Sequence, residues 1–224
     1  MAGHRAPLSR DRILQAALTL VDRDGLEAIS MRRVGEALGV EAMSLYNHVA
    51  SKAALLDGLF ELVLAELPSA GPAVRWRPAL RERALALRAA LAAHPNALPL
   101  FTSRPAVTPA ALAHVERVLE VLRTAGFSVD EALSVLQCLV AFVVGHTVST
   151  RGPRIPREDA RPGYALLGEV EFLRVREAAL TLAAHDVEEE FALGLDAFLD
   201  GFAARLRRSR HPPGAAPHSP LAGG

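Results

Sequence analysis

Apolar residues recur every three or four positions along most of this chain, which is the spacing of helices that bury one face. The first such stripe predicts a helix over residues 10–24, with Ser9 before it as an N-cap and Gly25 after it as a stop. A second helix is expected to begin after Ser30, another candidate N-cap, and to end at Gly39.

Two more helices follow after very short breaks. The pattern predicts a short helix over residues 42–48 and a longer one that Ser51 caps and Pro68 ends. The break over residues 39–41 is tight, and a short turn that sets one helix across another is typical of a helix-turn-helix. The first quarter of the chain is therefore expected to be a three-helix head with a connecting helix.

Further helices are expected beyond a linker rich in proline and glycine at residues 68–75. The helix ranges are 78–93, 109–124, 130–149, 169–183 and 187–208, with a short segment at 96–102. Residues 1–8 look like a basic arm and 151–163 like a loop, because proline and glycine interrupt regular structure there. We expect an all-α fold of about nine or ten helices, divided into residues 1–67, residues 68–208 and a disordered tail over 209–224.

The overall charge neither favours nor excludes a nucleic-acid partner, because 25 basic residues balance 25 acidic ones. Any DNA-binding surface must then be local. Cys138 is the only cysteine, which excludes an intramolecular disulfide and a cysteine-based zinc site, and we assign it to the core. The histidines lack metal-ligand spacing, so no metal or cofactor is expected. No apolar run reaches the roughly 18 residues of a spanning helix, and residues 1–9 lack a signal core. A cytoplasmic protein with no membrane partner is expected.

The second helix of a helix-turn-helix lies in the major groove and reads base edges, while the first braces it against the DNA backbone. Val40 and Leu45 fit inward positions, and the other side chains of this segment stay available to DNA. Of the two arginines in the first turn of the preceding helix, Arg32 and Arg33, we choose Arg32 as the reader of a guanine. Small apolar side chains suit a thymine methyl, and longer polar ones reach phosphates. The expected DNA-contacting residues are Arg32, Ala42, Met43, Ser44, Tyr46, Asn47, His48 and Lys52.

This region resembles the DNA-binding head of the tetracycline-repressor (TetR) family of transcriptional regulators. The resemblance rests on residues 13–18, on Gly25-Leu26, on the run from Ser30 to Val40 and on the run from Ser44 to Leu56. It implies a two-fold homodimer that places Arg32 and the 42–48 helix on a double-stranded operator. Ala42 and Met43 replace a more polar pair in the tetracycline repressor itself, so a different operator is expected.

Residues 75–206 resemble, more loosely, the ligand-binding domain of the same type. The resemblance is carried by Trp76, His94-Pro95, Arg104-Pro105, Ala125-Gly126-Phe127 and the segment 191–201. It implies that the helices near 130–149 and 187–208 form a four-helix bundle between two copies. The last helix carries an apolar stripe with small residues beside it: Phe191, Leu195, Phe198, Leu199 and Phe202, with Gly194, Ala197 and Gly201. Burial of this stripe against the core of its own domain is the commoner explanation for a single helix, but the small residues would allow a partner helix to approach closely, and we favour dimerisation.

The resemblance also implies a ligand pocket. At the positions where the tetracycline repressor holds drug and magnesium, the resemblance implies that this chain has Phe101, Arg83, Val118 and Ser149. These residues offer few of the oxygen ligands that Mg²⁺ requires. We therefore predict a largely apolar effector other than magnesium–tetracycline, with Arg83 and Arg104 as polar anchors. Core packing would explain the apolar members of the expected lining equally well; the lining is Arg83, Leu87, Leu91, Phe101, Arg104, Val118, Leu122, Leu133 and Leu136.

Three functions are compatible with these features to different degrees. The leading hypothesis is a dimeric repressor that a small molecule releases from DNA. An enzyme is disfavoured, because the chain shows no Ser-His-Asp grouping, no glycine-rich phosphate loop and no clustered carboxylates. The third hypothesis keeps DNA binding but replaces the small molecule with a partner protein, or with no effector at all.

Overall fold

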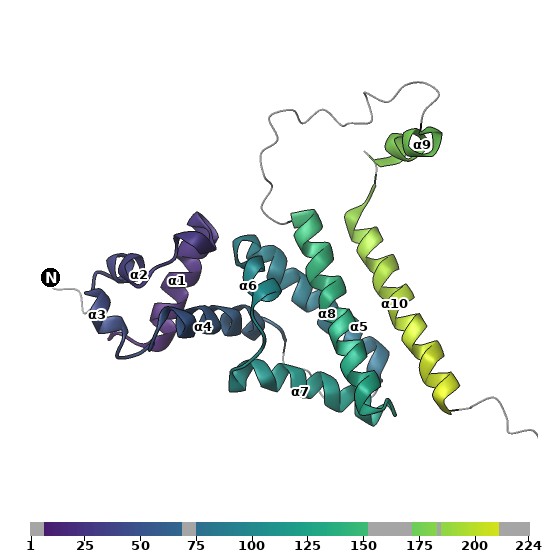
Figure 1. The fold of residues 1–224 in the computed structure, drawn as a ribbon, viewed down its shortest axis with the longest axis horizontal. Coiled ribbons are helices and arrows are strands. Elements are labelled where there is room, and N and C mark those ends of the chain that lie inside the picture. The colour runs from purple at the N-terminus through teal and green to yellow at the C-terminus, as the bar shows by residue number, and fades with distance from the viewer. Residues whose placement is uncertain (1–6, 69–74, 152–171, 183–184, 211–224) are drawn as a thin grey trace, which may run out of the picture.

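The computed structural model describes residues 7–68, 75–151, 172–182 and 185–210, and in these ranges it contains ten α-helices and no strand (Figure 1). The all-α prediction is confirmed. The helices are α1 (Arg10–Asp24), α2 (Met31–Leu38), α3 (Ala42–Leu45), α4 (Lys52–Ala65), α5 (Trp76–Ala93), α6 (Leu98–Ser103), α7 (Pro109–Thr124), α8 (Val129–Arg151), α9 (Leu173–Leu182) and α10 (Val187–Arg210). Two 3₁₀ turns, η1 (Leu26–Ala28) and η2 (Pro95–Ala97), precede α2 and α6.

Serine side chains cap the starts of three helices in the head. The hydroxyls of Ser9, Ser30 and Ser51 each accept a hydrogen bond from the backbone N–H three residues later, at 3.3, 3.3 and 3.1 Å. Each bond satisfies a backbone donor that the first helical turn leaves without a partner. Gly39 ends α2 in the left-handed conformation, with φ 66° and ψ 40°, which a side chain would disfavour. The predicted starts of α1, α2 and α4 are confirmed.

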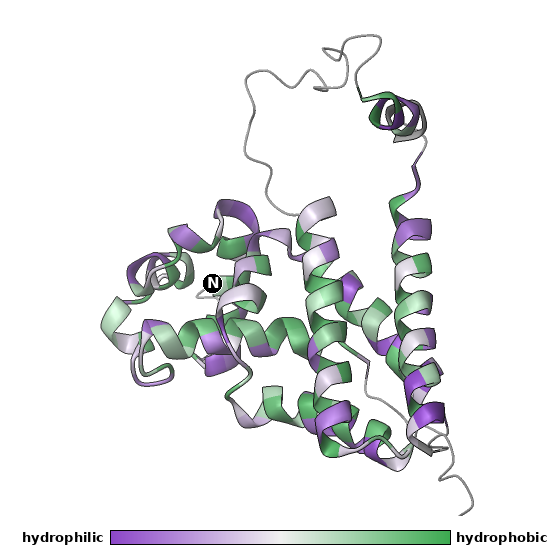
Figure 2. Ribbon diagram, turned by 45° about the vertical axis from the view of Figure 1, so that its right-hand side comes forward, coloured by the Kyte–Doolittle hydropathy of each residue, from purple (hydrophilic) through white to green (hydrophobic). Residues whose placement is uncertain are grey.

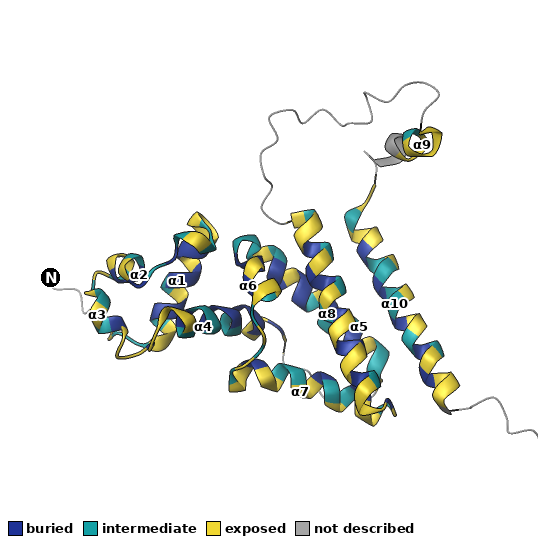
Figure 3. Ribbon diagram, in the orientation of Figure 1, coloured by how far each residue is buried: buried dark blue, intermediate teal, exposed yellow. Residues whose placement is uncertain are grey.

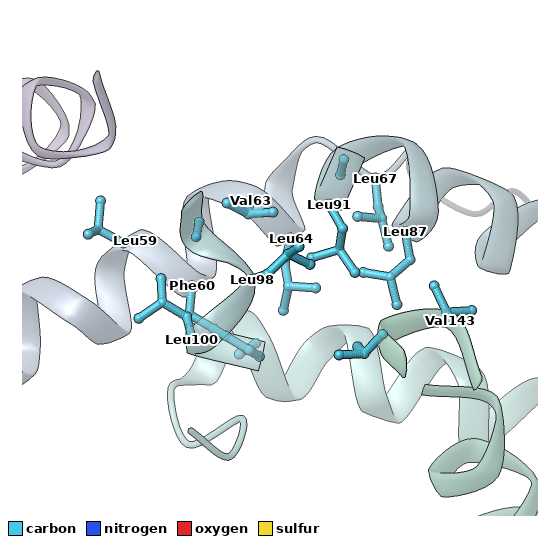
Figure 4. Close-up of a cluster of buried hydrophobic side chains, with 14 of the residues drawn as sticks. Leu59, Phe60, Val63, Leu64, Leu67, Leu87, Leu91, Leu98, Leu100 and Val143 are labelled. Carbon is cyan, nitrogen blue, oxygen red and sulfur yellow. The ribbon is translucent and has the colours of Figure 1, made fainter. Parts of the chain in front are cut away.

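Helix α4 is shared by the head and by the rest of the molecule. It runs from α1 and α3 at one end to α5, α6 and α7 at the other (Figure 1). Leu59 and Phe60 lie toward the head end, while Val63, Leu64 and Leu67 meet leucines of α5 and α6 (Figure 4). Because its side chains are buried on more than one face, α4 belongs to one apolar core that runs through both halves.

The larger half is a helical array in which α5 packs against α7, α8 and α10. The buried strips of these helices face one another, and their outer faces are largely exposed (Figure 3). Helix α9 stands away from the array in both views (Figures 1 and 2), with Phe172, Leu173 and Val175 exposed at its start.

Helix α8 is the one helix of the described ranges that is long and apolar enough to cross a membrane by length and composition alone. Polar residues interrupt its sequence, so α8 contains no unbroken apolar run of spanning length. Only 39% of the most apolar part of α8 is buried in this chain, although it packs against α5, α7 and α10. An apolar outer face is therefore left on α8.

Several sequence predictions need correction. Helix α3 ends at Leu45 rather than at 48, because the N–H groups of Tyr46 and His48 bond to carbonyls three residues back, and the chain tightens into a turn. Cys138 is exposed on α8 rather than buried in the core. Helix α10 continues through Ser209 to Arg210 rather than ending at 208. The predicted start of α9 at 169 lies outside the described residues, in which this helix runs from Leu173.

Other predictions fall on residues outside the described ranges. They are the greater part of the basic arm (1–6), of the linker (69–74), of the loop after α8 (152–163) and of the C-terminal tail (211–224).

The crossing of α2 and α3 depends on Gly35. A Cβ atom at this position would lie 2.8 Å from the carbonyl oxygen of Val40 and 3.2 Å from the backbone nitrogen of Ala42. Both neighbours are backbone atoms, so they cannot rotate away as a side chain would. The absence of a side chain here allows the turn to fold tightly onto α2.

We predict that Gly35→Ala lowers the free energy of unfolding by about 2 kcal/mol, because the new methyl group pushes α2 and α3 apart. Helix propensity alone would give the opposite sign, a gain of about 1 kcal/mol. Urea unfolding measures the difference. The control Ala37→Gly, at an exposed position of the same helix, should cost about 1 kcal/mol. A Gly35→Ala variant more stable than the parent would contradict the tight crossing.

Candidate functional site

The short helix α3 and the turn that follows it present a largely polar outer surface to solvent, with Met43 as its most exposed side chain on α3. Leu45 is fully buried and anchors the helix to the head, whereas Met43 is 73% exposed and Tyr46 is 44% exposed. Ala42 and Ser44 are half-buried, and Asn47, His48 and Lys52 are exposed. The residues predicted to contact DNA therefore form one continuous surface on α3, the following turn and the start of α4.

The two arginines at the start of α2 have different environments. The guanidinium of Arg33 donates to Asp24 at 2.5 Å and to the Ala28 carbonyl at 3.1 Å, so it fastens α2 to the end of α1. Arg32 has an 82% exposed side chain and only a loose pair with Glu36 at 3.6 Å. Arg32 is free to reach a base or phosphate beside α3, and Arg33 is held in place.

An ion pair joins α4 to the segment after α6. Arg104 donates through Nε to Asp57 at 2.9 Å, and its terminal nitrogen also lies 3.3 Å from the Ala53 carbonyl. Arg104 was expected to anchor an effector, but this structure commits its guanidinium to the first half of α4. It links the larger half to the helix that carries the head.

His94 makes a second link between the halves. Its Nδ1 lies 2.9 Å from Asp22 at the end of α1, and its Nε2 lies 2.7 Å from Glu66 just after α4. Asn96 adds a bond to the Asp22 carbonyl at 2.9 Å. Burial alone would lower the pKa of His94, but the two carboxylates outweigh it and raise the pKa above its ordinary value. An open cleft of about 290 Å³ lies beside this group, between α1 and the end of α4.

The predicted effector residues fall into three groups. Leu87, Leu91, Val118, Leu122 and Leu136 are buried between α5, α7 and α8. Arg83 and Phe101 are half-buried at the margin, with the Phe101 ring centroid 4.5 Å from that of Phe60 on α4. Leu133 does not join them, because its side chain is 47% exposed on the outer side of α8. Its contact with an effector stays a prediction that burial does not support.

Sequence reasoning missed a buried charge beside this region. Arg88 is 8% exposed, donates two hydrogen bonds to Glu188 of α10 and lies 4.5 Å above the ring of Phe191. Its burial could have been predicted from the sequence, because Arg88 lies on the same apolar face of the helix as Ala84, Leu87 and Leu91. Glu188 also accepts from Arg151, and together the arginines lower its pKa to about 2.

His146 lies next to this ion pair. Its ring meets that of Phe191 edge-on at 5.0 Å, and both ring nitrogens are buried without a hydrogen-bond partner in the described ranges. Burial and the nearby Arg88 lower its pKa. No group of three or more His, Cys, Asp or Glu side chains placed to hold a metal ion occurs among the described residues.

Family models and known relatives match both halves of this chain. The family model described as the C-terminal domain of tetracyclin-repressor-like proteins matches residues 67–206, and that of bacterial regulatory proteins of the tetR family matches residues 13–59. The tetracycline repressor protein class E of Escherichia coli is 33% identical, over 93% of this chain and 97% of its own length. The HTH-type transcriptional repressor DrrR1 of Streptomyces coeruleorubidus is 32% identical, over 93% of this chain and 82% of its own.

Solved structures show the same fold. Apo ActR from Streptomyces coelicolor superposes with a TM-score of 0.77 at 28% identity, covering 91% of this chain and 99% of that one. The complex of ActR with actinorhodin gives a TM-score of 0.75 at 30% identity, with 90% and 99% covered.

We predict that the His94 link stabilises the protein more at low pH than at high pH. A raised folded pKa means that the contribution is fully present below the ordinary pKa of about 6.5 and is lost as the pH rises through the folded value. The variant His94→Gln should therefore cost about 1–2 kcal/mol at about pH 6 and clearly less at about pH 8.5, as measured by urea unfolding.

The matched control is His185→Gln. His185 pairs with Glu190 at 3.0 Å, but both side chains are about half exposed, so its loss should change stability little at either pH. An equal cost of His94→Gln at both values would show that protonation does not strengthen the link.

Proposed function

Because this chain belongs to the TetR family and is a transcriptional repressor of that family, we propose that it binds a palindromic operator as a homodimer and releases it when a small organic molecule occupies the larger half. The observation that carries this proposal is the exposed surface of α3, whose side chains other than Leu45 have no structural role in the core. A helix held by one buried leucine is suited to enter a major groove.

We assign the reading of the operator to α3 and to the residues beside it. Met43 and Ala42 offer apolar contacts for thymine methyl groups, and Ser44 offers a hydroxyl for a base edge or a phosphate. Tyr46, Asn47, His48 and Lys52 lie on the turn and at the start of α4, where they would meet phosphates. Arg32 completes the set from α2. Non-specific affinity would come from the phosphate contacts, and sequence preference from Arg32 and the first turn of α3.

A second copy of the chain is the proposed partner of the outer faces of α8 and α10. On α8, Cys138, Ala141, Gly145 and Val148 are exposed at spacings of three and four residues, and on α10 Leu193, Ala197 and Gly201 are exposed at spacings of four. A Cβ atom at Gly145 or Gly201 would meet nothing within 4 Å, so the packing of this chain does not require glycine there. Glycine and alanine on adjacent helices allow two more helices to approach closely, which favours the four-helix bundle. The same face explains the apolar composition of α8 without a membrane.

An effector is proposed to lie between α5, α7 and α8, among the buried leucines and Val118. The ActR structures include complexes with actinorhodin and with (S)-DNPA, which supports control by an organic molecule in a related fold. We propose that the effector here is not magnesium–tetracycline, because Phe101 and Val118 bring no oxygen ligands and the described residues hold no metal-binding group. Binding, rather than catalysis, is the proposed activity of this region.

Release would follow from a change in the position of α4. Leu64 and Leu67 contact the core of the larger half, while Leu55 and Leu59 lie in the core of the head. An effector that favours a shifted α4 would alter the separation of the two α3 helices, which must match successive major grooves. Control by a partner protein, or by no effector, remains the alternative; a dose-dependent rise of the melting temperature with organic compounds would favour the small molecule.

We predict that Arg32→Ala weakens operator binding by about 10- to 100-fold, the value of a bidentate base contact, measured by fluorescence anisotropy with DNA from upstream of the gene. The control is Arg208→Ala, which removes the same charge from an exposed position near the end of α10. Equal affinities of parent and Arg32→Ala would remove Arg32 from the reading surface, and no binding by the folded parent at low salt would reject the proposed function.

We also predict that Ala197→Arg converts the dimer to a monomer, because an arginine on the close-packed face cannot be accommodated between two copies. The residue is exposed in the single chain, so folding should be unaffected. Light scattering after size exclusion gives the mass and circular dichroism gives the helix content. Leu112→Arg, on the exposed side of α7, should remain a dimer. A dimeric Ala197→Arg variant would place the interface elsewhere.

A further inference from the structure

The arginines of α5 divide into two groups by their partners. Three of them pair with carboxylates of α10: Arg77 with Asp200 at 2.8 Å, Arg81 with Asp196 at 3.1 Å, and Arg88 with Glu188. Arg83 lies on the side of α5 that faces α7 and has no carboxylate partner in the described ranges. A carboxylate therefore balances the positive charge of each of the other three arginines, but no described carboxylate pairs with Arg83.

The partner that Arg83 has is His114 on α7. A terminal nitrogen of the guanidinium donates to Nδ1 of His114, and since arginine has no acceptor, that ring nitrogen must be unprotonated. The imidazole is therefore neutral while this bond exists. Burial lowers the pKa of Arg83, as does the positive charge of Arg117 one turn from His114. Burial and Arg83 likewise lower the pKa of His114.

The surroundings combine this positive charge with apolar walls. Leu87 follows Arg83 by one turn on α5 and is 9% exposed, and Val118 follows His114 by one turn on α7 and is 5% exposed. Arg83 and His114 are themselves only half-buried, so the guanidinium is reachable from solvent. Arg117 pairs loosely with Glu120 at 3.6 Å, and both side chains are more than half exposed. Arg83 has no such partner in the described ranges, so most of its five N–H donors are left for an anion.

We propose that Arg83, His114 and Arg117 form a binding site for the carboxylate of an organic acid whose apolar body lies against Leu87 and Val118. The inference rests on the proposed function, because it names the chemical class of the effector for the same half of the protein. A carboxylate accepts two parallel hydrogen bonds from a guanidinium and offsets the repulsion between Arg83 and Arg117. A cationic effector would meet that repulsion, and a neutral one would leave it in place.

The test uses the full chain with 2-naphthoate as probe and 2-naphthamide as its neutral match. Naphthoate should raise the melting temperature progressively with concentration, and the amide should not. Naphthoate should also raise the pKa of His114, followed by NMR of the histidine rings and assigned with His114→Gln, because a nearby anion favours the protonated ring. This second readout reports on the site itself in the unaltered protein.

Arg83→Gln keeps a hydrogen-bond donor but removes the charge, and it should weaken naphthoate binding about tenfold or more. Arg77→Gln on the same helix loses its pair with Asp200 and should bind naphthoate as the parent does. Equal stabilisation by the amide, an unchanged affinity in Arg83→Gln, or no response of either readout to naphthoate would overturn the proposal. A response to inorganic phosphate that equals the response to naphthoate would overturn the assignment to an organic acid.

None of these readouts involves DNA. Loss of operator binding by the folded parent would reject the proposed function, whereas operator binding without a response to naphthoate would reject the carboxylate site alone.

Discussion

The structure depends on the burial of one helix in two places. The buried residues of α4 lie on more than one side of the helix, so a single neighbouring helix cannot cover them all; they are Leu55, Gly58, Leu59, Phe60, Val63 and Leu64. Its first half lies against α1, where a Cβ atom at Gly58 would be 2.5 Å from a methyl carbon of Leu14. Its second half lies among α5, α6 and α7. A packed interior resists compression, so a displacement at one end of α4 is transmitted to the other rather than absorbed.

Charged groups define how far α4 can move. Arg104 holds its first half through Asp57, and His94 holds its end through Glu66 while also reaching Asp22 of α1. These links are partly exposed, so each contributes little to overall stability compared with the apolar core. They join specific points of the two halves, since each reaches from the larger half to α1 or to α4. The larger half is fixed in the same way on its other side, where α5 and α10 share three ion pairs.

Much of the fold follows from local signals, and the errors arise where distant residues decide. Serine caps and the left-handed Gly39 depend only on residues a few positions away, so the starts of α1, α2 and α4 could be predicted. Proline and glycine likewise marked the limits of α7. The end of α3, in contrast, is set by a tightened hydrogen-bond pattern that no residue type announces. Cys138 was wrongly assigned to the core for a related reason, because α8 is apolar on its outer face as well as its inner face, and composition cannot show which residues a single chain buries. The two partners of His94 lie 28 and 72 positions away in the sequence, and the partner of Arg104 lies 47 positions away. No pattern along the chain could have predicted these pairs.

Leu45 is the one fully buried side chain of α3, and this has a consequence for how such a protein changes over generations. Substitutions at Met43, Tyr46 or Asn47 alter an exposed surface and remove no contact from the interior. Most random mutations are filtered by their cost in folding, but these positions are almost exempt from that filter. A duplicated gene can therefore drift toward a new target sequence through folded intermediates, while the core beneath α3 stays constant. A change of target sequence can therefore proceed with little loss of folding stability, because the exposed residues that would read the DNA are separate from the buried Leu45.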